Sequence, residues 1–165
     1  MGTKEKRRLT DKEYKFIFSR APRLCLDFVI VKGGRVLLAK RAIDPYKGKW
    51  HLPGGMVRRE ESLVEASGRI INSELGVRPF GNRLLGFMEF PDEVNKNGLH
   101  VHSVSLVFLT KIKDEKITKN DQSEEVNFFQ NFPKNIHPVH GKFLKENRKL
   151  FTKQHQKNIC NKKKF

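Results

Sequence analysis

The sequence predicts an α/β sandwich of one domain, in which helices flank a mixed sheet. Two apolar, β-branched runs occupy residues 24–31 and 35–41, which is typical of strands. The pattern changes to a helical repeat over residues 60–75, and further strand-like runs follow it. Helices before, between and after the strands favour layers around one core, and 165 residues with 37% apolar content are enough to form it.

The N-terminal third is predicted to contain a short helix and a hairpin. Apolar side chains recur at three- and four-residue spacing within residues 10–20, which favours a helix. Gly33 and Gly34 separate the two apolar runs, as in a tight β-hairpin. A loop then leads to Trp50, whose indole we expect to pack in the core or against that loop.

The central helix and the C-terminal half are predicted from the same periodicities. The helix over residues 60–75 has an apolar face, and Gly76 is expected to end it. His137 and His140 lie near the start of a last amphipathic helix, and we expect them to face solvent. The remaining elements are expected as strands at about 82–90, 100–112 and 126–130 and as a helix at about 141–152.

Basic residues are concentrated at the two ends of the chain. The formal net charge is +16, of which residues 1–23 contribute +5 and residues 141–165 contribute +8. Segments at about 1–8 and 153–165 are therefore expected to be flexible, solvated tails outside the domain. Such tails are compatible with a nucleic-acid partner, but no aromatic-interleaved basic surface or helix-turn-helix pattern supports one.

Cysteine content and hydropathy predict a cytoplasmic protein with no membrane segment. Cys25 and Cys160 lie far apart, without the spacing of a metal site or a disulfide scaffold. No apolar region follows the basic N-terminus, and no apolar run approaches 18 residues.

A fixed pattern of residues runs through the predicted central helix. Gly55 is followed after five residues by Glu61 and after seven more by Arg69, and Gly76 closes the pattern. This spacing resembles the Nudix box. The resemblance implies a Nudix-type α/β/α sandwich that binds Mg²⁺ or Mn²⁺ and a nucleoside diphosphate compound. These four residues would be structural, with Glu61 and Arg69 forming an ion pair that shapes the loop.

The acidic cluster of that pattern is incomplete. Residues 70, 73 and 74 share one helix face, and in the common Nudix pattern all three are glutamates that hold the cation. Here they are Ile70, Ser73 and Glu74. One helix carboxylate with additional ligands suits one cation rather than two or three, which weakens the expectation of P–O cleavage.

The altered box is similar to that of the GDP-mannose mannosyl hydrolases, a Nudix subgroup. There the first glutamate is aliphatic, the second is small and the third is kept, as in Arg69 to Gly76. The likeness extends over about residues 8–150. It implies a homodimer in which the N-terminal segment takes part in the neighbour's site.

The subgroup resemblance implies a set of site residues. Arg41 would contact the diphosphate or the nucleotide and assist catalysis, as a bidentate donor suits phosphate oxygens. Leu9, Tyr14 and Asp27 would bind the substrate. One Mg²⁺ would be held by the Gly54 carbonyl, Glu74 and Gln122.

The implied reaction is attack of water on the anomeric carbon of a nucleoside diphosphate sugar such as GDP-mannose, with release of the nucleoside diphosphate. The subgroup's loop histidine is replaced by Ser123, so Glu124 or Glu125 is expected to be the general base. Both are alternatively surface charges on a loop.

The sequence is also compatible with two other functions. Pyrophosphate P–O cleavage of a nucleoside triphosphate, ADP-ribose or a dinucleotide would use Glu124 or Glu125 despite the lost carboxylates. A catalytically weak nucleotide-binding domain would explain those losses and use the basic tails.

Overall fold

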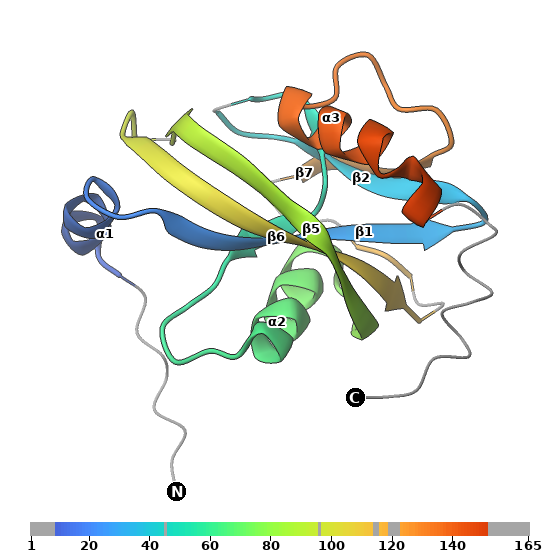
Figure 1. Cartoon of the computed structure of the whole chain (residues 1–165), viewed down its shortest axis with the longest axis horizontal. Helices are drawn as coiled ribbons and strands as arrows, with labels where there is room; N and C mark the ends of the chain where they lie inside the picture. The colour runs from blue at the N-terminus through green and yellow to red at the C-terminus, as the bar shows by residue number, and fades with distance from the viewer. Residues whose placement is uncertain (1–8, 45, 96, 114–115, 119–122, 152–165) are drawn as a thin grey trace, which may run out of the picture.

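A mixed sheet of seven strands forms the centre of the molecule, and α2 and α3 cover its opposite sides (Figure 1). The computed structural model describes residues 9–44, 46–95, 97–113, 116–118 and 123–151. The helices are α1 (Asp11–Phe18), α2 (Leu63–Leu75), α3 (Pro138–Glu146) and the 3₁₀ turn η1 (Arg148–Leu150). The strands are β1 (Arg23–Lys32), β2 (Arg35–Arg41), β3 (Trp50–His51), β4 (Gly54–Met56), β5 (Pro79–Val94), β6 (His100–Ile112) and β7 (Ser123–Phe129).

Capping residues determine where α1 and α2 begin. Ser62 forms a reciprocal capping box with Glu65, and Thr10 forms one with Glu13. The predicted start of the central helix at residue 60 was therefore three residues early, because Ser62 accepts the first free N–H group. The predicted stop is confirmed: Gly76 caps α2 with a left-handed backbone of φ +68°.

Strand β1 is the central element of the sheet. It pairs in parallel with β6 and antiparallel with β2 and β4, and the path of neighbours is β3-β2-β1-β6-β5. The predicted hairpin is confirmed, since Gly33 and Gly34 join β1 to β2 with φ of +59° and +77°. β7 pairs with the other side of β2.

Alternating residues of β1 contribute to two different cores. Leu26, Phe28 and Ile30 are buried against α2, whereas Val29 belongs to the core under α3 with Phe143 and Leu144. Trp50 packs edge-on against Phe129 in the second core, as expected. Arg23, Cys25 and Asp27 share the face of Val29, so β1 presents polar groups on the α3 side of the sheet.

Several predicted boundaries were wrong. β3 and β4 lie in a stretch for which no element was predicted, because strands of two and three residues have no periodicity of their own. β5 extends beyond 82–90 at both ends, through three register shifts against β6. α3 begins at Pro138 rather than 141, where the proline ring suits the first helical turn. None of the described helices is long and apolar enough to span a bilayer.

Candidate active site

A cavity of about 170 Å³ lies on the α3 side of the sheet, over β1, β6 and β5. Its floor carries polar side chains of all three strands, and its walls come from the loop before β3, from β3 and β4, and from the start of α3. The lining residues from the sheet are Arg23, Cys25, Asp27, Arg41, Phe90, Glu93, Ser103 and Ser105; those from the walls are Tyr46, Lys49, His51, Leu52, Gly54, Gly55, His137 and His140. The cavity therefore brings together segments that are far apart in the sequence.

Besides Arg23, two cationic side chains line the cavity. Arg41 ends β2, and its Nε donates to the carbonyl of Ile43 at 3.0 Å. Burial lowers the pKa of Arg41, but Glu93 and Glu74 oppose that effect, so the guanidinium stays charged. Lys49 lines the same cavity. Together these groups suit the oxygens of a diphosphate.

Arg23 ties the floor of the cavity to α1. Its guanidinium donates to Glu93 at 2.8 Å, to the Ser103 hydroxyl at 2.6 Å and to the Tyr14 hydroxyl at 2.5 Å. Tyr14 thus reaches the cavity through Arg23 and does not line it itself. Leu9 is 40% exposed and lies outside the lining.

Asp27 lies at the base of the cavity, where β1 pairs with β4. Its carboxylate accepts a short hydrogen bond from Ser105 and packs directly against Gly54. A Cβ at position 54 would overlap that carboxylate and lie 2.7 Å from the Leu26 carbonyl oxygen, so only glycine fits there. Burial raises the pKa of Asp27 to about 7, and Glu74 adds to the effect.

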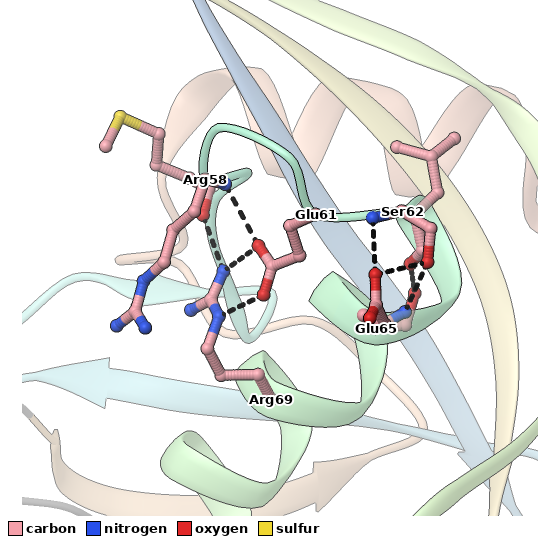
Figure 2. A network of polar contacts seen from close by, with 8 residues as sticks. Arg58, Glu61, Ser62, Glu65 and Arg69 are labelled. Carbon is pink, nitrogen blue, oxygen red and sulfur yellow. Dashed lines mark hydrogen bonds and ion pairs between the residues drawn. The ribbon is translucent and has the colours of Figure 1, made fainter. Parts of the chain in front are cut away.

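The predicted ion pair holds the loop between β4 and α2 (Figure 2). Arg69 Nε and Nη2 donate to the two oxygens of Glu61 at 2.6 and 2.8 Å. Glu61 also accepts from the Arg58 amide at 2.9 Å, and Arg69 donates to the Met56 carbonyl at 2.9 Å. The pair therefore fixes β4, which contains Gly54 and Gly55.

The helix positions that carry glutamates in the common Nudix pattern have separate environments. Ile70 is 2% exposed and packs in the core of α2, where its side chain lies 3.3 Å from a Cβ built on Gly55. Ser73 is exposed and Glu74 is half-buried. Ile70 and Ser73 carry no charge, whereas the charge of Glu74 raises the pKa of both Asp27 and Arg41.

The donors near Gly54 are oxygen atoms, which fit a hard divalent cation. Within the described ranges, no group of three or more His, Cys, Asp or Glu side chains is placed to hold a metal. A cation held by the Glu74 carboxylate and the Gly54 carbonyl would need substrate phosphates and water as its other ligands, which is common for Mg²⁺. The predicted third ligand, Gln122, lies outside the described residues, as do the basic tails.

Glu124 and Glu125 lie on β7, beside the end of β2. Arg41 pairs with Ser123 and Lys40 with Glu125, and Glu124 lies 3.4 Å from the Lys40 ammonium. Both glutamates line a separate depression with Ile117 and Phe128 rather than the cavity. The structure thus places them next to Arg41 along the sheet.

The expectation that His137 and His140 face solvent was wrong. They are 5% and 7% exposed, because α3 packs its first turn over β5 and β3. His51, which sequence reasoning did not single out, joins them with a ring centroid 6.1 Å from that of His140. Burial lowers the pKa of His51 to about 4, and burial with the charges of Arg41 and Lys49 does the same for His137.

Comparison with known proteins finds relatives over most of the chain. The NUDIX domain family matches residues 23–153. The low-salt glycan biosynthesis protein Agl8 of Haloferax volcanii is 30% identical over 139 residues, covering 83% of this chain and 89% of Agl8. An ADP-ribose pyrophosphatase of Methanocaldococcus jannaschii is 35% identical over 115 residues, covering 68% of this chain and 66% of that enzyme.

Solved structures agree in fold. The MutT NUDIX hydrolase from Burkholderia pseudomallei has a TM-score of 0.68 at 30% identity, covering 76% of this chain and 98% of that one. The NUDIX domain of Shewanella oneidensis NrtR, solved with ADP ribose, has a TM-score of 0.62 at 21% identity, covering 87% and 100%.

Proposed function

Because the chain belongs to the Nudix hydrolase family, we propose that it hydrolyses a nucleoside diphosphate sugar with the help of one divalent cation, Mg²⁺ or Mn²⁺. Water attacks the anomeric carbon, the bond from that carbon to the phosphate oxygen breaks, and the electron pair leaves with the nucleoside diphosphate. The proton of the water passes to a carboxylate. GDP-mannose is the first substrate to test.

The observation that carries this proposal is the burial of Ile70 in the core under α2. The position that bears the first glutamate of the common Nudix pattern packs apolar side chains here, and Ser73 offers no carboxylate. A site with one helix carboxylate supports a leaving diphosphate better than attack on phosphorus, which uses several cations. The similarity to a glycan biosynthesis protein also supports sugar-nucleotide chemistry.

Each side chain has a role in this proposal. Glu74 and the Gly54 carbonyl hold the cation, with Gln122 as the proposed third ligand. A bound cation would neutralise charge on the departing diphosphate, and Arg41 and Lys49 would do the same from the protein. Asp27 contacts Gly54 and is proposed to bind the substrate at the base of the cavity.

Glu124 and Glu125 are the proposed bases. They follow Ser123, which pairs with Arg41, so both lie on the strand next to a cationic side chain of the cavity. Leu9 and Tyr14 are proposed to complete the nucleotide site of the neighbouring subunit in a homodimer. The exposure of Leu9 and of Phe16 on α1 suits a contact of that kind.

The second candidate function is pyrophosphate P–O cleavage of ADP-ribose. The 35% identity to an ADP-ribose pyrophosphatase favours it. In that reaction Glu124 or Glu125 would activate water for attack on phosphorus instead of carbon.

Hydrolysis in ¹⁸O-labelled water distinguishes the two. The purified chain is incubated with Mg²⁺ and GDP-mannose, other nucleoside diphosphate sugars, ADP-ribose or nucleoside triphosphates, and products are analysed by mass spectrometry. Label in the free sugar supports attack on the anomeric carbon, whereas label in a phosphate product supports P–O cleavage. Turnover that survives Glu74→Gln unchanged would refute the cation site.

A further inference from the structure

The wall of the cavity at the start of α3 contains a buried imidazole that its described neighbours do not satisfy. His137 is only 5% exposed and lines the cavity, and neither of its ring nitrogens has a hydrogen-bond partner among the described residues. Leaving a buried donor and acceptor unpaired costs free energy, because both groups have lost their hydrogen bonds to water. A ligand that supplies both partners would recover that free energy.

Aromatic rings surround His137 on three sides. Its ring centroid lies 4.4 Å from that of Tyr46, 5.0 Å from that of His140 and 5.7 Å from that of Phe90. Tyr46 and Phe90 also line the cavity. The rings of Tyr46 and Phe90 meet that of His137 at 83° and 55°, so neither pair is stacked in parallel as a slot for a flat nucleobase would be.

The backbone of Leu52 fixes the tautomer of a second histidine. Its amide donates to His140 Nδ1 at 3.1 Å, so the proton of the neutral His140 ring is on Nε2. His51 Nδ1 contacts the Leu52 carbonyl at 2.7 Å and donates to it. His51 and His140 are therefore held by the C=O and N–H groups of the same residue, Leu52, and neither of these bonds uses an Nε2 atom.

The strained conformation of Tyr46 is a second, independent observation. Its backbone has φ +67°, a region that residues other than glycine rarely adopt. The loop around it is closed by hydrogen bonds, from Gly48 N to Arg41 O at 2.8 Å and from Lys49 N to Tyr46 O at 3.0 Å. The fold thus holds the Tyr46 ring against His137 at some energetic cost.

The geometry points to a sugar subsite formed by His137, His140, Tyr46 and Phe90, which binds the hydroxyl groups of the glycosyl half of the substrate. This inference rests on the proposed function and names which end of the cavity takes the sugar. A neutral imidazole has one donor and one acceptor, as does each sugar hydroxyl, while the C–H faces of a sugar ring pack on aromatic side chains. Arg41 and Lys49 next to this subsite take the diphosphate.

Calorimetric binding to the full chain tests the subsite. Titrations with GDP-mannose, ADP-ribose, GDP and ADP are made with Ca²⁺ in place of Mg²⁺ to slow turnover. His137→Phe keeps the ring and removes both nitrogens. We expect it to weaken binding of the two sugar nucleotides about tenfold and to leave GDP and ADP binding within about twofold of the native value.

Two variants serve as controls. His100→Phe makes the same change at an exposed histidine that pairs with Asp92 outside the cavity, and it should alter none of the affinities. His137→Gln retains one donor and one acceptor and should restore part of the lost sugar-nucleotide affinity. Circular dichroism will show whether His137→Phe folds. If it does not, the affinities of His137→Gln test the subsite instead.

Three results would overturn the inference. Equal losses of affinity for GDP and GDP-mannose in His137→Phe would place the diphosphate or the base at His137. Unchanged affinities would show that His137 has no role in binding. Sugar-nucleotide binding that tightens steeply from pH 7.5 to 5.5 in the native chain but not in His137→Phe would indicate an anion site beside Arg41, Lys49 and His140. Because binding needs no turnover, a subsite confirmed in a protein without hydrolytic activity would refute only the proposed function.

Discussion

Removing the charge of Glu61 tests how the loop between β4 and α2 is held. Glu61 accepts two hydrogen bonds from Arg69 and one from the Arg58 amide, and its side chain is 6% exposed against 28% for Arg69. Breaking a buried ion pair costs about 3–5 kcal/mol, whereas an exposed pair is worth about 0–1 kcal/mol. Since Arg69 keeps some contact with water and glutamine keeps one acceptor, we expect Glu61→Gln to lower the free energy of unfolding by about 2 kcal/mol.

Urea denaturation followed by circular dichroism measures that loss. The midpoint should fall by about 1 M for a chain with an m-value of about 2 kcal/mol/M. Arg69 lowers the pKa of Glu61, so the advantage of the native chain over Glu61→Gln is present above pH 4.5 and is lost as the pH falls below that value.

The neighbouring glutamate provides a matched control. Glu60 is 69% exposed and pairs with Arg59, which is 91% exposed, so Glu60→Gln should change the unfolding free energy by less than about 0.5 kcal/mol. Equal losses for the two variants would refute the argument that burial and the three hydrogen bonds set the magnitude. Because Arg69 also holds the Met56 carbonyl of β4, Glu61→Gln should reduce turnover as well.

Three further changes probe the cavity and the helix behind it. The Cβ added by Gly54→Ala would overlap the Asp27 carboxylate, so this change should lower the unfolding free energy by about 2–3 kcal/mol and remove most of the turnover. Gly68→Ala has open space around its Cβ and should preserve stability and turnover. Equal melting temperatures for the two variants would contradict this reasoning. Ile70→Glu restores the residue of the common Nudix pattern, but it buries a charge, so it should lower the melting temperature without adding P–O cleavage. Ser73→Glu changes an exposed residue and should leave the melting temperature unchanged. The pKa of His137 is lowered to about 4 in the folded state, so the neutral ring's contribution to stability is complete above pH 6.5 and is lost as the pH falls toward 4. The unfolding free energy should therefore fall by about 2 kcal/mol less in His137→Phe than in the native chain between pH 7.5 and 5.0. An equal fall in the two proteins would contradict that pKa.

Local patterns in the sequence were sufficient to predict most of the fold. The hairpin at Gly33 and Gly34 and the stop at Gly76 depend on backbone conformations that glycine adopts readily, so they can be read from single residues. The Glu61–Arg69 pair was implied by the resemblance of this stretch to the Nudix box, and it is confirmed. β3 and β4 could not be predicted, because their strand character comes only from pairing with β2 and β1.

The candidate site was predictable only in part, for the same reason. Arg41 and Gly54 belong to short motifs, whereas the burial of His140 depends on a hydrogen bond from Leu52, 88 positions away. A Pro-Val pair beside two histidines is typical of an exposed turn, and no local signal shows that α3 folds over β5. Arg23 and Glu93 likewise meet only once β1 and β5 are assembled.

The parallel pairing of β1 with β6 also sets a time scale for synthesis of the chain. Arg23 and Ser103, which face each other across that pairing, are 80 positions apart. A ribosome adding about 5–20 residues per second takes roughly 4–16 s to cover that distance. During this interval β1 can form its hairpin with β2 but lacks its partner on the other side, and the unpaired edge of an apolar strand is prone to aggregation. A chaperone that acts on the nascent chain would therefore be expected to bind β1, and to be released once β6 has been made.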